Sequence, residues 1–485
     1  MTPRSPAAGA PDATDTTERR FLASTVASWL SLLVRLAVSF AARVILARLL
    51  LPELHGLYEE ALRIVILASA LRDLGLRFHL IRDPRRPYGT VLAFSVVNGA
   101  LITVALAAAA PLAASINAEL PALLQVYAVW VLLDGLVQAP RAYFERELRI
   151  GRMAAAEILR GIAMAVVSVA LAWAGWGVWS FIVGDLVAAA LFAALIWRRA
   201  WGRMPVAVEP RLLPDLLRRS WLLFAIWAVL QIVTYIDVFI IEAYGATVTV
   251  GHYARAYMVA FLVPQIVAPR ALLPALVAYR DDAARFFAAF RVGTVFLMFF
   301  QVTAGWFLFI NAERVVAILL GPEWGPAVPL LKVLCFVPFL DVFTDLGGEV
   351  LKVRNEDRLW LAIMVVNLAS LVTIGVLFTR RWGALGMAAA NFFYLGNLLM
   401  AWRMSRIFAA GFRRLIADLA WLYLVPVPFF AAAAALFPSG SWGRLFVSAA
   451  AALAAGAVLL LRFYRPFRSF FGPDGVPGTT PSAGC

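Results

Sequence analysis

The sequence predicts an all-α polytopic membrane protein with about 14 transmembrane helices, arranged as two parallel six-helix lobes plus two C-terminal helices. Three observations predict this fold class: the composition, the alternation of long apolar runs with short polar breaks, and a short motif that occurs twice. Of the 485 residues, 63% are hydrophobic and 15% are charged, and the mean hydropathy is +0.84. These values exceed the apolar share of ordinary soluble proteins, so we expect the chain to lie in a lipid bilayer.

The apolar runs are each long enough to cross a bilayer, which takes about 20 mostly apolar residues per helix. The first six predicted helices cover residues 24–50, 55–75, 89–112, 121–141, 153–173 and 177–197. The next six cover residues 220–243, 252–278, 287–310, 326–350, 359–379 and 384–402, and the last two cover 415–436 and 444–461. The predicted domains are a disordered tail (1–22), an N-lobe (23–200), a linker (201–219), a C-lobe (220–408), helices 13 and 14 (409–464) and a second tail (465–485).

The basic residues orient the chain in the bilayer. One alternate set of connections, which includes both termini, holds 31 of the 43 Lys and Arg residues, whereas the opposite set holds only four. Because cytoplasmic connections carry the excess of Lys and Arg, both termini and the linker are predicted to be cytoplasmic. The formal net charge of +14 is thereby explained by topology and requires no nucleic-acid partner.

Catalytic and metal chemistry have little support in this sequence. Two cysteines and three histidines are too few and too scattered for a disulfide framework or a metal site, and nothing suggests a cofactor. Every predicted external connection is short, and the longest connection, residues 198–219, is too short to hold an active site. We therefore expect no enzyme and no catalytic residues.

The motif GxYxxA occurs twice, as GLYEEAL at residues 56–62 and as GHYARAY at residues 251–257. Six predicted helices separate the copies, so both halves of the chain enter the membrane in the same direction. Parallel repeats of this kind are a transporter plan in which the substrate lies between the repeats. An alternative interpretation is that Gly and Ala only permit close helix packing at two similar corners.

Three segments resemble polysaccharide and oligosaccharide-lipid flippases of the multidrug/oligosaccharidyl-lipid/polysaccharide exporter superfamily. They are ARLLLPELHGLYEEALRIVILASALRDLGLRFHLIRD (47–83), YIDVFIIEAYGATVTVGHYARAYMVAFLVPQIVAP (235–269) and LGPEWGPAVPLLKVL (320–334). The resemblance implies a cell (inner) membrane protein that flips a polyprenyl-(pyro)phosphate-linked oligosaccharide to the external leaflet for lipopolysaccharide or exopolysaccharide biosynthesis. Glu242 departs from the family pattern, in which many relatives carry Gly or a basic residue.

Four arginines within the predicted helices are candidate ligands for the lipid-linked phosphate. The resemblance implies that helices 1, 2, 7 and 8 line a central cavity and that its basic residues bind this phosphate. The matching residues are Arg35, Arg43, Arg63 and Arg255. The guanidinium fork suits a phosphate because it makes two parallel charge-assisted hydrogen bonds.

Each arginine also has a structural interpretation. Arg35 could extend toward the membrane surface, although its position near the middle of its helix favours a cavity. Arg63 follows Glu59 by four residues and Glu60 by three, which is the spacing of an ion pair on one helix face. Arg255 occupies the place of Glu60 in the second motif copy and could anchor an interface.

Acidic residues within the predicted helices are candidates for ion coupling. Asp341, Asp345 and Glu349 recur every four residues and form a stripe that could bind Na⁺ or H⁺. The alternative is the wall of a wet vestibule paired with arginines. Asp237 matches an acidic position of the resembled family and could instead make a hydrogen bond in helix packing. Glu157 and Arg160, three residues apart, are expected to pair.

Two competing functions remain open at the level of sequence. The first is a cation-coupled multidrug exporter of the same superfamily, which would have a cavity dominated by acidic and aromatic residues. The second is a membrane assembly factor without transport, which would have closed and fully packed lobe interfaces. The expected partners of a flippase are the polyprenyl-linked saccharide, the bilayer, Na⁺ or H⁺, and other polysaccharide-assembly proteins.

Overall fold

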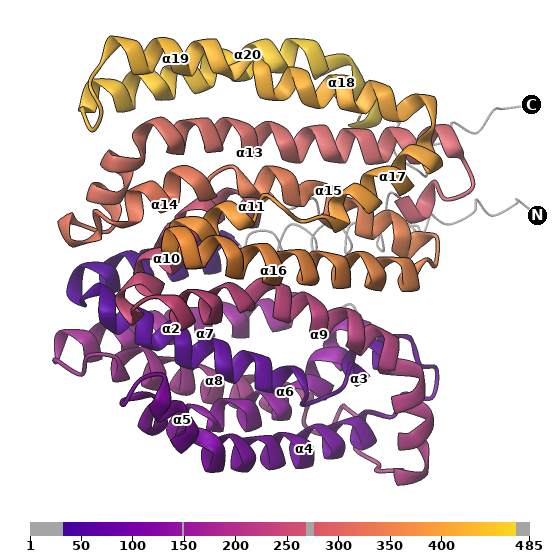
Figure 1. Cartoon of the computed structure of the whole chain (residues 1–485). Coiled ribbons are helices and arrows are strands. Elements are labelled where there is room, and N and C mark those ends of the chain that lie inside the picture. Colours follow the sequence, from indigo (N-terminus) through magenta and orange to yellow (C-terminus); the bar gives the residue numbers. More distant parts are fainter. Residues whose placement is uncertain (1–32, 148–149, 268–275, 472–485) are drawn as a thin grey trace, which may run out of the picture.

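The computed structural model describes residues 33–147, 150–267 and 276–471, and all regular structure in these residues is helical. The helices lie roughly side by side and follow the chain from the indigo segments at one edge of Figure 1 to the yellow segments at the other. We call the end of the molecule at which α20 finishes the terminal end, and the other the distal end. The predicted tails, 1–22 and most of 465–485, lie outside the described residues.

The first group of helices comes from the first 200 residues. It contains the helix of residues 33–49, α2 (Pro52–Ala70), α3 (Leu76–Arg82), α4 (Tyr88–Ala109), η1 (Ala110–Ser115), α5 (Leu120–Tyr127), α6 (Val129–Arg146), α7 (Ile150–Trp173) and α8 (Trp179–Ala200). Buried apolar side chains form two clusters here, one around Leu124 and Phe181 and the other around Phe144 and Phe192.

The second group follows a connection that includes η2 (Pro210–Leu212). It contains α9 (Leu213–Tyr244), α10 (Thr247–Ala260), α11 (Leu262–Val267), α13 (Ala283–Leu319), η3 (Pro322–Trp324), α14 (Ala327–Leu334), α15 (Val337–Val353), α16 (Asp357–Ala390) and α17 (Gly396–Phe408). The final helices, α18 (Ala410–Leu424), α19 (Pro426–Leu436) and α20 (Trp442–Phe471), pack against α13 at one edge of the molecule (Figure 1).

Ten helical stretches in the described residues are long and apolar enough to cross a membrane. Large apolar side chains such as Leu453 and Leu461 are exposed on their outer surfaces, where a bilayer would cover them. The chain is therefore a multi-pass membrane protein. Charge lowers the apolar character of α2, and α10 has only 14 residues, so neither is among the ten. The count of 14 spanning helices stays a prediction.

Several predicted helices are bent or divided where the sequence removes a backbone hydrogen bond. Pro338 lies in the first turn of α15, shortly after the end of α14, and Pro426 divides α18 from α19. Gly383, at φ 60°, turns the chain inside α16, at the break predicted between residues 379 and 384. Proline lacks the N–H that a continuous helix needs, and glycine accepts positive φ at little steric cost.

Helix α9 contacts both groups. Near its start it packs against α3, where the Ser220 hydroxyl donates to the Leu74 carbonyl at 3.1 Å and Gly75 lies against the backbone of Phe224. Further along it makes an extensive contact with α16 of the second group. It is thus the element that links the two groups along their length.

Candidate functional site

The two copies of GxYxxA meet at the distal end, where α2 crosses α10. A Cβ atom placed on Gly56 would lie 1.9 Å from the Thr247 carbonyl oxygen, and one placed on Gly251 would lie 2.1 Å from the Pro52 carbonyl oxygen. No side chain fits in such a space, so each glycine is required by the backbone of the other group. Close packing by small residues, one of the two interpretations of the motif, is therefore confirmed, and the contact joins the two groups.

Arg255 lies fully inside this interface. Its side chain is 2% exposed, and Nη2 lies 2.7 Å from Nδ1 of His55 and 3.5 Å from a Glu59 carboxylate oxygen. Because arginine keeps its protons, the His55 Nδ1 accepts this hydrogen bond, and Nε2 faces the Leu46 carbonyl oxygen at 3.3 Å. In this structure Arg255 anchors the interface by contacting His55 and Glu59 of α2.

Arg63 belongs to the same network. Its guanidinium lies 3.3 Å from Glu59 and 3.9 Å from Asp237, and it stacks over the Tyr235 ring at 4.7 Å. Glu59 therefore holds Arg63 from its own helix and Arg255 from the second group. Both arginines are buried and paired with carboxylates of the described residues in this structure.

A second set of contacts closes the rim of the distal end. The Arg48 guanidinium donates to the carbonyl oxygens of Ile318 and Leu319 at the last turn of α13, and the Trp324 indole donates to the Ala47 carbonyl at 2.8 Å. A cation at a helix C-terminus also interacts favourably with the helix dipole. The end of the helix of residues 33–49 is thereby tied to the second group.

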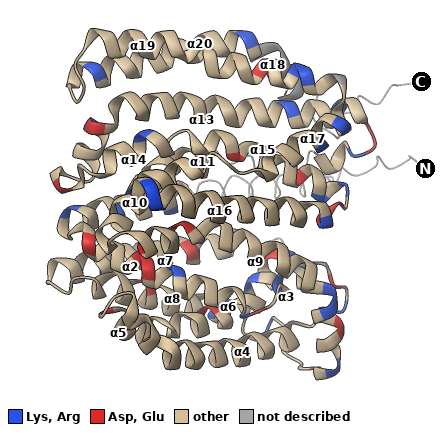
Figure 2. Ribbon diagram, in the orientation of Figure 1, with Lys and Arg blue, Asp and Glu red and all other residues tan. Residues whose placement is uncertain are grey.

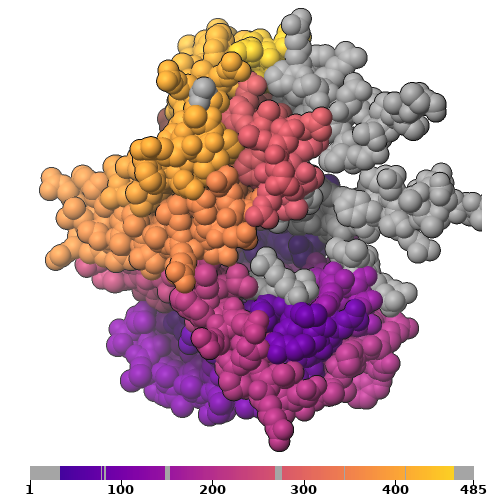
Figure 3. Space-filling model, turned by 90° about the vertical axis from the view of Figure 1, so that its right-hand side faces the viewer, coloured from indigo at the N-terminus to yellow at the C-terminus, as the bar shows by residue number. Residues whose placement is uncertain are grey.

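The opposite face of the molecule is hollowed. Figure 3 looks at the terminal end and shows a recess between the purple and magenta atoms below and the red and orange atoms above, with dark indigo atoms at its bottom. Figure 2 shows that many of the Lys and Arg residues gather toward this same end. The described residues therefore combine a closed distal end with a recess at the terminal end.

The first cavity, of about 270 Å³, lies between the helix of residues 33–49, α7 and α8. Its polar lining residues are Arg35, Ser39, Arg43, Glu157, Arg160 and Asp185. Three of the six are arginines. The structure thus brings two of the four predicted phosphate ligands, Arg35 and Arg43, to one cavity.

The carboxylates of the first cavity are already in use. Glu157 accepts from Arg35 at 2.7 Å and from Arg141 at 3.0 Å, and Asp185 accepts from the hydroxyls of Tyr58 and Tyr127 at 2.7 and 2.5 Å.

Arg43 and Arg160 make no ion pair among the described residues. The expected pairing of Glu157 with Arg160 is wrong, because two other arginines occupy Glu157 while Arg160 lies over the Phe192 ring. Sequence reasoning overlooked Arg160 as a cavity residue because the three-residue spacing suggested a local pair.

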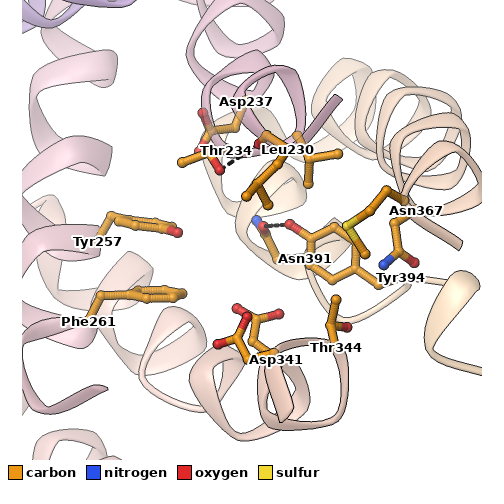
Figure 4. A pocket seen from close by; sticks show the side chains of 13 residues that line it. Leu230, Thr234, Asp237, Tyr257, Phe261, Asp341, Thr344, Asn367, Asn391 and Tyr394 are labelled. Atoms are coloured by element: carbon orange, nitrogen blue, oxygen red, sulfur yellow. Dashed lines mark hydrogen bonds between the residues drawn. The ribbon is translucent and has the colours of Figure 1, made fainter. Parts of the chain in front are cut away.

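The second cavity, of about 210 Å³, lies within the second group between α9, α10, α15 and α16 (Figure 4). Its polar lining residues are Thr234, Asp237, Tyr257, Asp341, Thr344, Asp345, Asn367, Asn391 and Tyr394. Figure 4 shows Asp341 facing the rings of Tyr257 and Phe261 on one side and Tyr394 on another. None of the described residues that line this cavity is basic, and the cavity presents oxygen atoms and aromatic rings.

The predicted acidic stripe is divided by the structure. Asp341 and Asp345 line the second cavity and make no ion pair among the described residues, whereas Glu349 pairs with Lys352 at 2.8 Å further along α15. Asp237 lines the cavity and also lies 3.9 Å from Arg63, so it touches both the cavity and the network. In the described residues no group of three or more His, Cys, Asp or Glu is placed to hold a metal ion.

Comparison with known proteins agrees with these observations. The fold is similar to that of solved transporters of the MOP superfamily. An inward-closed structure of the lipid II flippase MurJ superimposes with a TM-score of 0.75 at 12% identity, over 92% of this chain and 99% of that one. An inward-facing MATE multidrug resistance transporter gives a TM-score of 0.60 at 15% identity, over 80% of this chain and 98% of that one.

A third structure, a MOP transporter from Pyrococcus furiosus whose title describes a binding pocket of reversed polarity, gives a TM-score of 0.58 at 14% identity, over 81% of this chain and 96% of that one. Residues 45–329 match the family described as polysaccharide biosynthesis protein, and the chain belongs to this family. Comparison with curated protein sequences gives no match.

Proposed function

We propose that this protein is a flippase that moves a polyprenyl-(pyro)phosphate-linked oligosaccharide from the cytoplasmic to the external leaflet. The observation that carries the proposal is the first cavity, where Arg43 and Arg160 make no ion pair among the described residues and have Asp185 as a more distant carboxylate. Arg160 is half-buried and Arg43 is exposed beside the cavity; because a charge within a membrane is costly without a counter-ion, an anionic ligand is the partner that this cavity suits. Membership of a polysaccharide biosynthesis family supports a saccharide substrate.

The proposed topology follows from the charges. The terminal end is cytoplasmic by the positive-inside rule, with both termini there, and the membrane is the cell (inner) membrane. The two groups act as two parallel lobes, 23–200 and 220–408, with a linker at 201–219 and helices 13 and 14 at 409–464. With the distal end closed and the recess at the terminal end, this structure represents an inward-facing state.

The phosphate is bound in the first cavity by Arg35, Arg43 and Arg160. Arg63 and Arg255 reach the phosphate only after the distal interface opens, because Glu59 and His55 occupy them when it is closed. The two arginines would thus bind carboxylates in the closed state and the phosphate in the open state. The substrate then has a different affinity for the two states, which a transport cycle requires. Alternating access then moves the headgroup across while the polyprenyl tail stays in the bilayer.

The second cavity is proposed to take up the coupling ion. Asp341 and Asp345, with Asp237 beside them, supply oxygen ligands without a nearby free cation, as Na⁺ or H⁺ binding requires. Glu349 contributes less, since Lys352 neutralises it.

A cation-coupled multidrug exporter is the second candidate function. It is favoured by one observation, the aromatic and acidic lining of the second cavity, in which a cationic drug could stack on Tyr257 and Phe261. A non-transporting assembly factor is opposed by the two polar cavities and the recess.

The test compares binding by the purified full-length protein with export in cells. Arg43→Ala/Arg160→Ala should weaken binding of a short polyprenyl diphosphate by at least 10-fold, since each lost charge-assisted bond contributes about 1.5–3 kcal/mol. Surface polysaccharide should fall in cells that depend on the protein. The matched control is Arg462→Ala in α20, whose side chain lies over Phe463 away from both cavities.

Unchanged binding and unchanged polysaccharide at normal protein level would contradict the flippase proposal. Binding of lipophilic cations that does not change in the arginine variant, together with no binding of polyprenyl diphosphate, would favour the exporter.

A further inference from the structure

A pair of carboxyl groups at the distal interface has no role in the function proposed above. Glu60 follows Glu59 in α2, and Glu242 lies in the last turn of α9. The Glu60 and Glu242 side chains lie within hydrogen-bonding reach of each other. One residue belongs to the first group and the other to the helix that leads into α10 of the second group.

Glu60 is almost completely buried, with 2% of its surface exposed. Both of its carboxylate oxygens, and Oε2 of Glu242, are buried and make no hydrogen bond of normal geometry among the described residues, although the Thr247 hydroxyl lies near Glu60 as well as Glu242. The remaining oxygen, Oε1 of Glu242, accepts from the Thr247 hydroxyl at 3.1 Å, and the Asn117 amide in turn donates to that hydroxyl at 3.3 Å. A polar group buried without partners is costly, so three such oxygens in contact point to a missing ligand.

The neighbouring charges do not neutralise the pair. Glu59, on the same helix, is held by Arg63 and Arg255, and Asp237 on α9 faces Arg63. His55 on α2 is engaged by Arg255 of α10, and Arg380 of α16 stacks over the Tyr244 ring. Neither Glu60 nor Glu242 makes an ion pair among the described residues.

We propose that Glu60 and Glu242 together form a proton-binding site that locks the distal ends of the two helix groups. Two carboxylates in contact cannot both be ionised at low cost, and one proton turns their repulsion into a strong O–H···O⁻ hydrogen bond. The proton comes from bulk water as hydronium while the interface is open, and returns to water when it opens again.

The site makes the closure of the distal interface depend on pH. Proton uptake favours the closed distal interface and so resets the protein toward the inward-facing state. Loss of the proton leaves two facing carboxylates that repel, and this favours opening. If the distal end is external, as proposed above, the acidic side of an energised membrane would favour closure after the substrate has left.

The test measures the distance between the groups at the distal end as a function of pH. Spin labels are placed at Leu112→Cys and Leu385→Cys, which are exposed residues of η1 and α16. The background carries Cys335→Ala and Cys485→Ser. In reconstituted full-length protein, the population with separated labels should rise at least threefold from pH 5 to pH 9.

The single variants Glu60→Gln and Glu242→Gln test the assignment. A glutamine amide donates the hydrogen bond that the shared proton provides, so either variant should stay closed at every pH. Glu53→Gln is the matched control, because Glu53 lies on the same helix and is exposed; it should keep the wild-type dependence. The distance reports on the interface alone, so the result does not depend on which substrate is transported.

Three results would overturn the proposal. They are an unchanged distance in the wild type between pH 5 and pH 9, a wild-type pH dependence retained in both glutamine variants, and a distance that follows Na⁺ concentration at fixed pH instead of the proton.

Discussion

The two cavities occupy the two helix groups yet present opposite charges. The first cavity is lined by Arg35, Arg43 and Arg160, and the second by Asp237, Asp341 and Asp345. The helices that carry the shared GxYxxA frame, α2 and α10, meet each other between these cavities. In the function proposed above, this difference assigns an anion to the cavity of the first group and a cation to the cavity of the second.

The largest effect should come from reversing the charge of the first cavity. Arg43→Glu/Arg160→Glu would make the cavity as acidic as the second, replacing two attractions to phosphate by two repulsions. We expect transport of the lipid-linked saccharide to fall by more than 100-fold, because each lost bond alone is worth about 1.5–3 kcal/mol. The measurement is the external exposure of the saccharide in proteoliposomes at matched protein content. Transport near the wild-type rate would show that the first cavity does not hold the phosphate.

An intermediate effect is expected from removing the charges of the second cavity. In the wild type, saturating Na⁺ or H⁺ should stabilise the protein by about 2.7 kcal/mol at 100 times the dissociation constant. Asp341→Asn/Asp345→Asn should abolish this stabilisation in thermal unfolding experiments while leaving polyprenyl diphosphate binding unchanged. Glu349→Gln, at a carboxylate paired with Lys352, serves as the control. Persistence of the cation effect in the double variant would contradict the assignment of the coupling ion to this cavity.

The smallest effect should come from a charge that lies in neither cavity. Asp83, in the connection between α3 and α4, accepts from Arg85 at 2.7 Å, and these hydrogen bonds lower its carboxyl pKa to about 2. Asp83→Asn should cost about 1 kcal/mol of stability at pH 7 and leave transport unchanged, as measured by thermal unfolding and flipping assays.

The pH dependence of the Asp83 contribution follows from its lowered pKa. An unperturbed Asp has a pKa of about 3.9. The stabilisation is therefore complete above that value and is lost as the pH falls toward about 2. A stability difference between Asp83→Asn and the wild type that stays constant down to pH 2 would contradict this account.

The general fold could be predicted because its signals are local. Apolar length and the asymmetry of Lys and Arg in the connections reveal helices that cross a bilayer, and the family resemblance agrees with the family match and with the MurJ and MATE folds. The break at Gly383 falls between the predicted helices 359–379 and 384–402. The Ala128 junction between α5 and α6 falls inside the predicted helix 121–141 and depends on tertiary packing, so it is not visible in an apolar run.

The candidate site was predicted only in part because contacts across helices decide which charges are free. The sequence places Arg63 and Arg255 in the membrane, yet Glu59 and His55 engage both of them. The freedom of Arg160 depends on Arg35 and Arg141, which are distant in sequence and take up Glu157. Sequence spacing identifies neighbours along one helix and is silent about the partners that other helices supply.

Helix α9 gives the molecule a mechanical link between its two ends. At 32 residues and 1.5 Å per residue it is about 48 Å long. Its only proline is Pro214, in the first turn, and it contains no glycine, so it lacks the usual points at which a helix bends. A tilt of about 10° would swing one tip through about 8 Å. Such a rod would convert proton loss at one face of the bilayer into a movement at the other face. The substrate need not contact the proton-binding site.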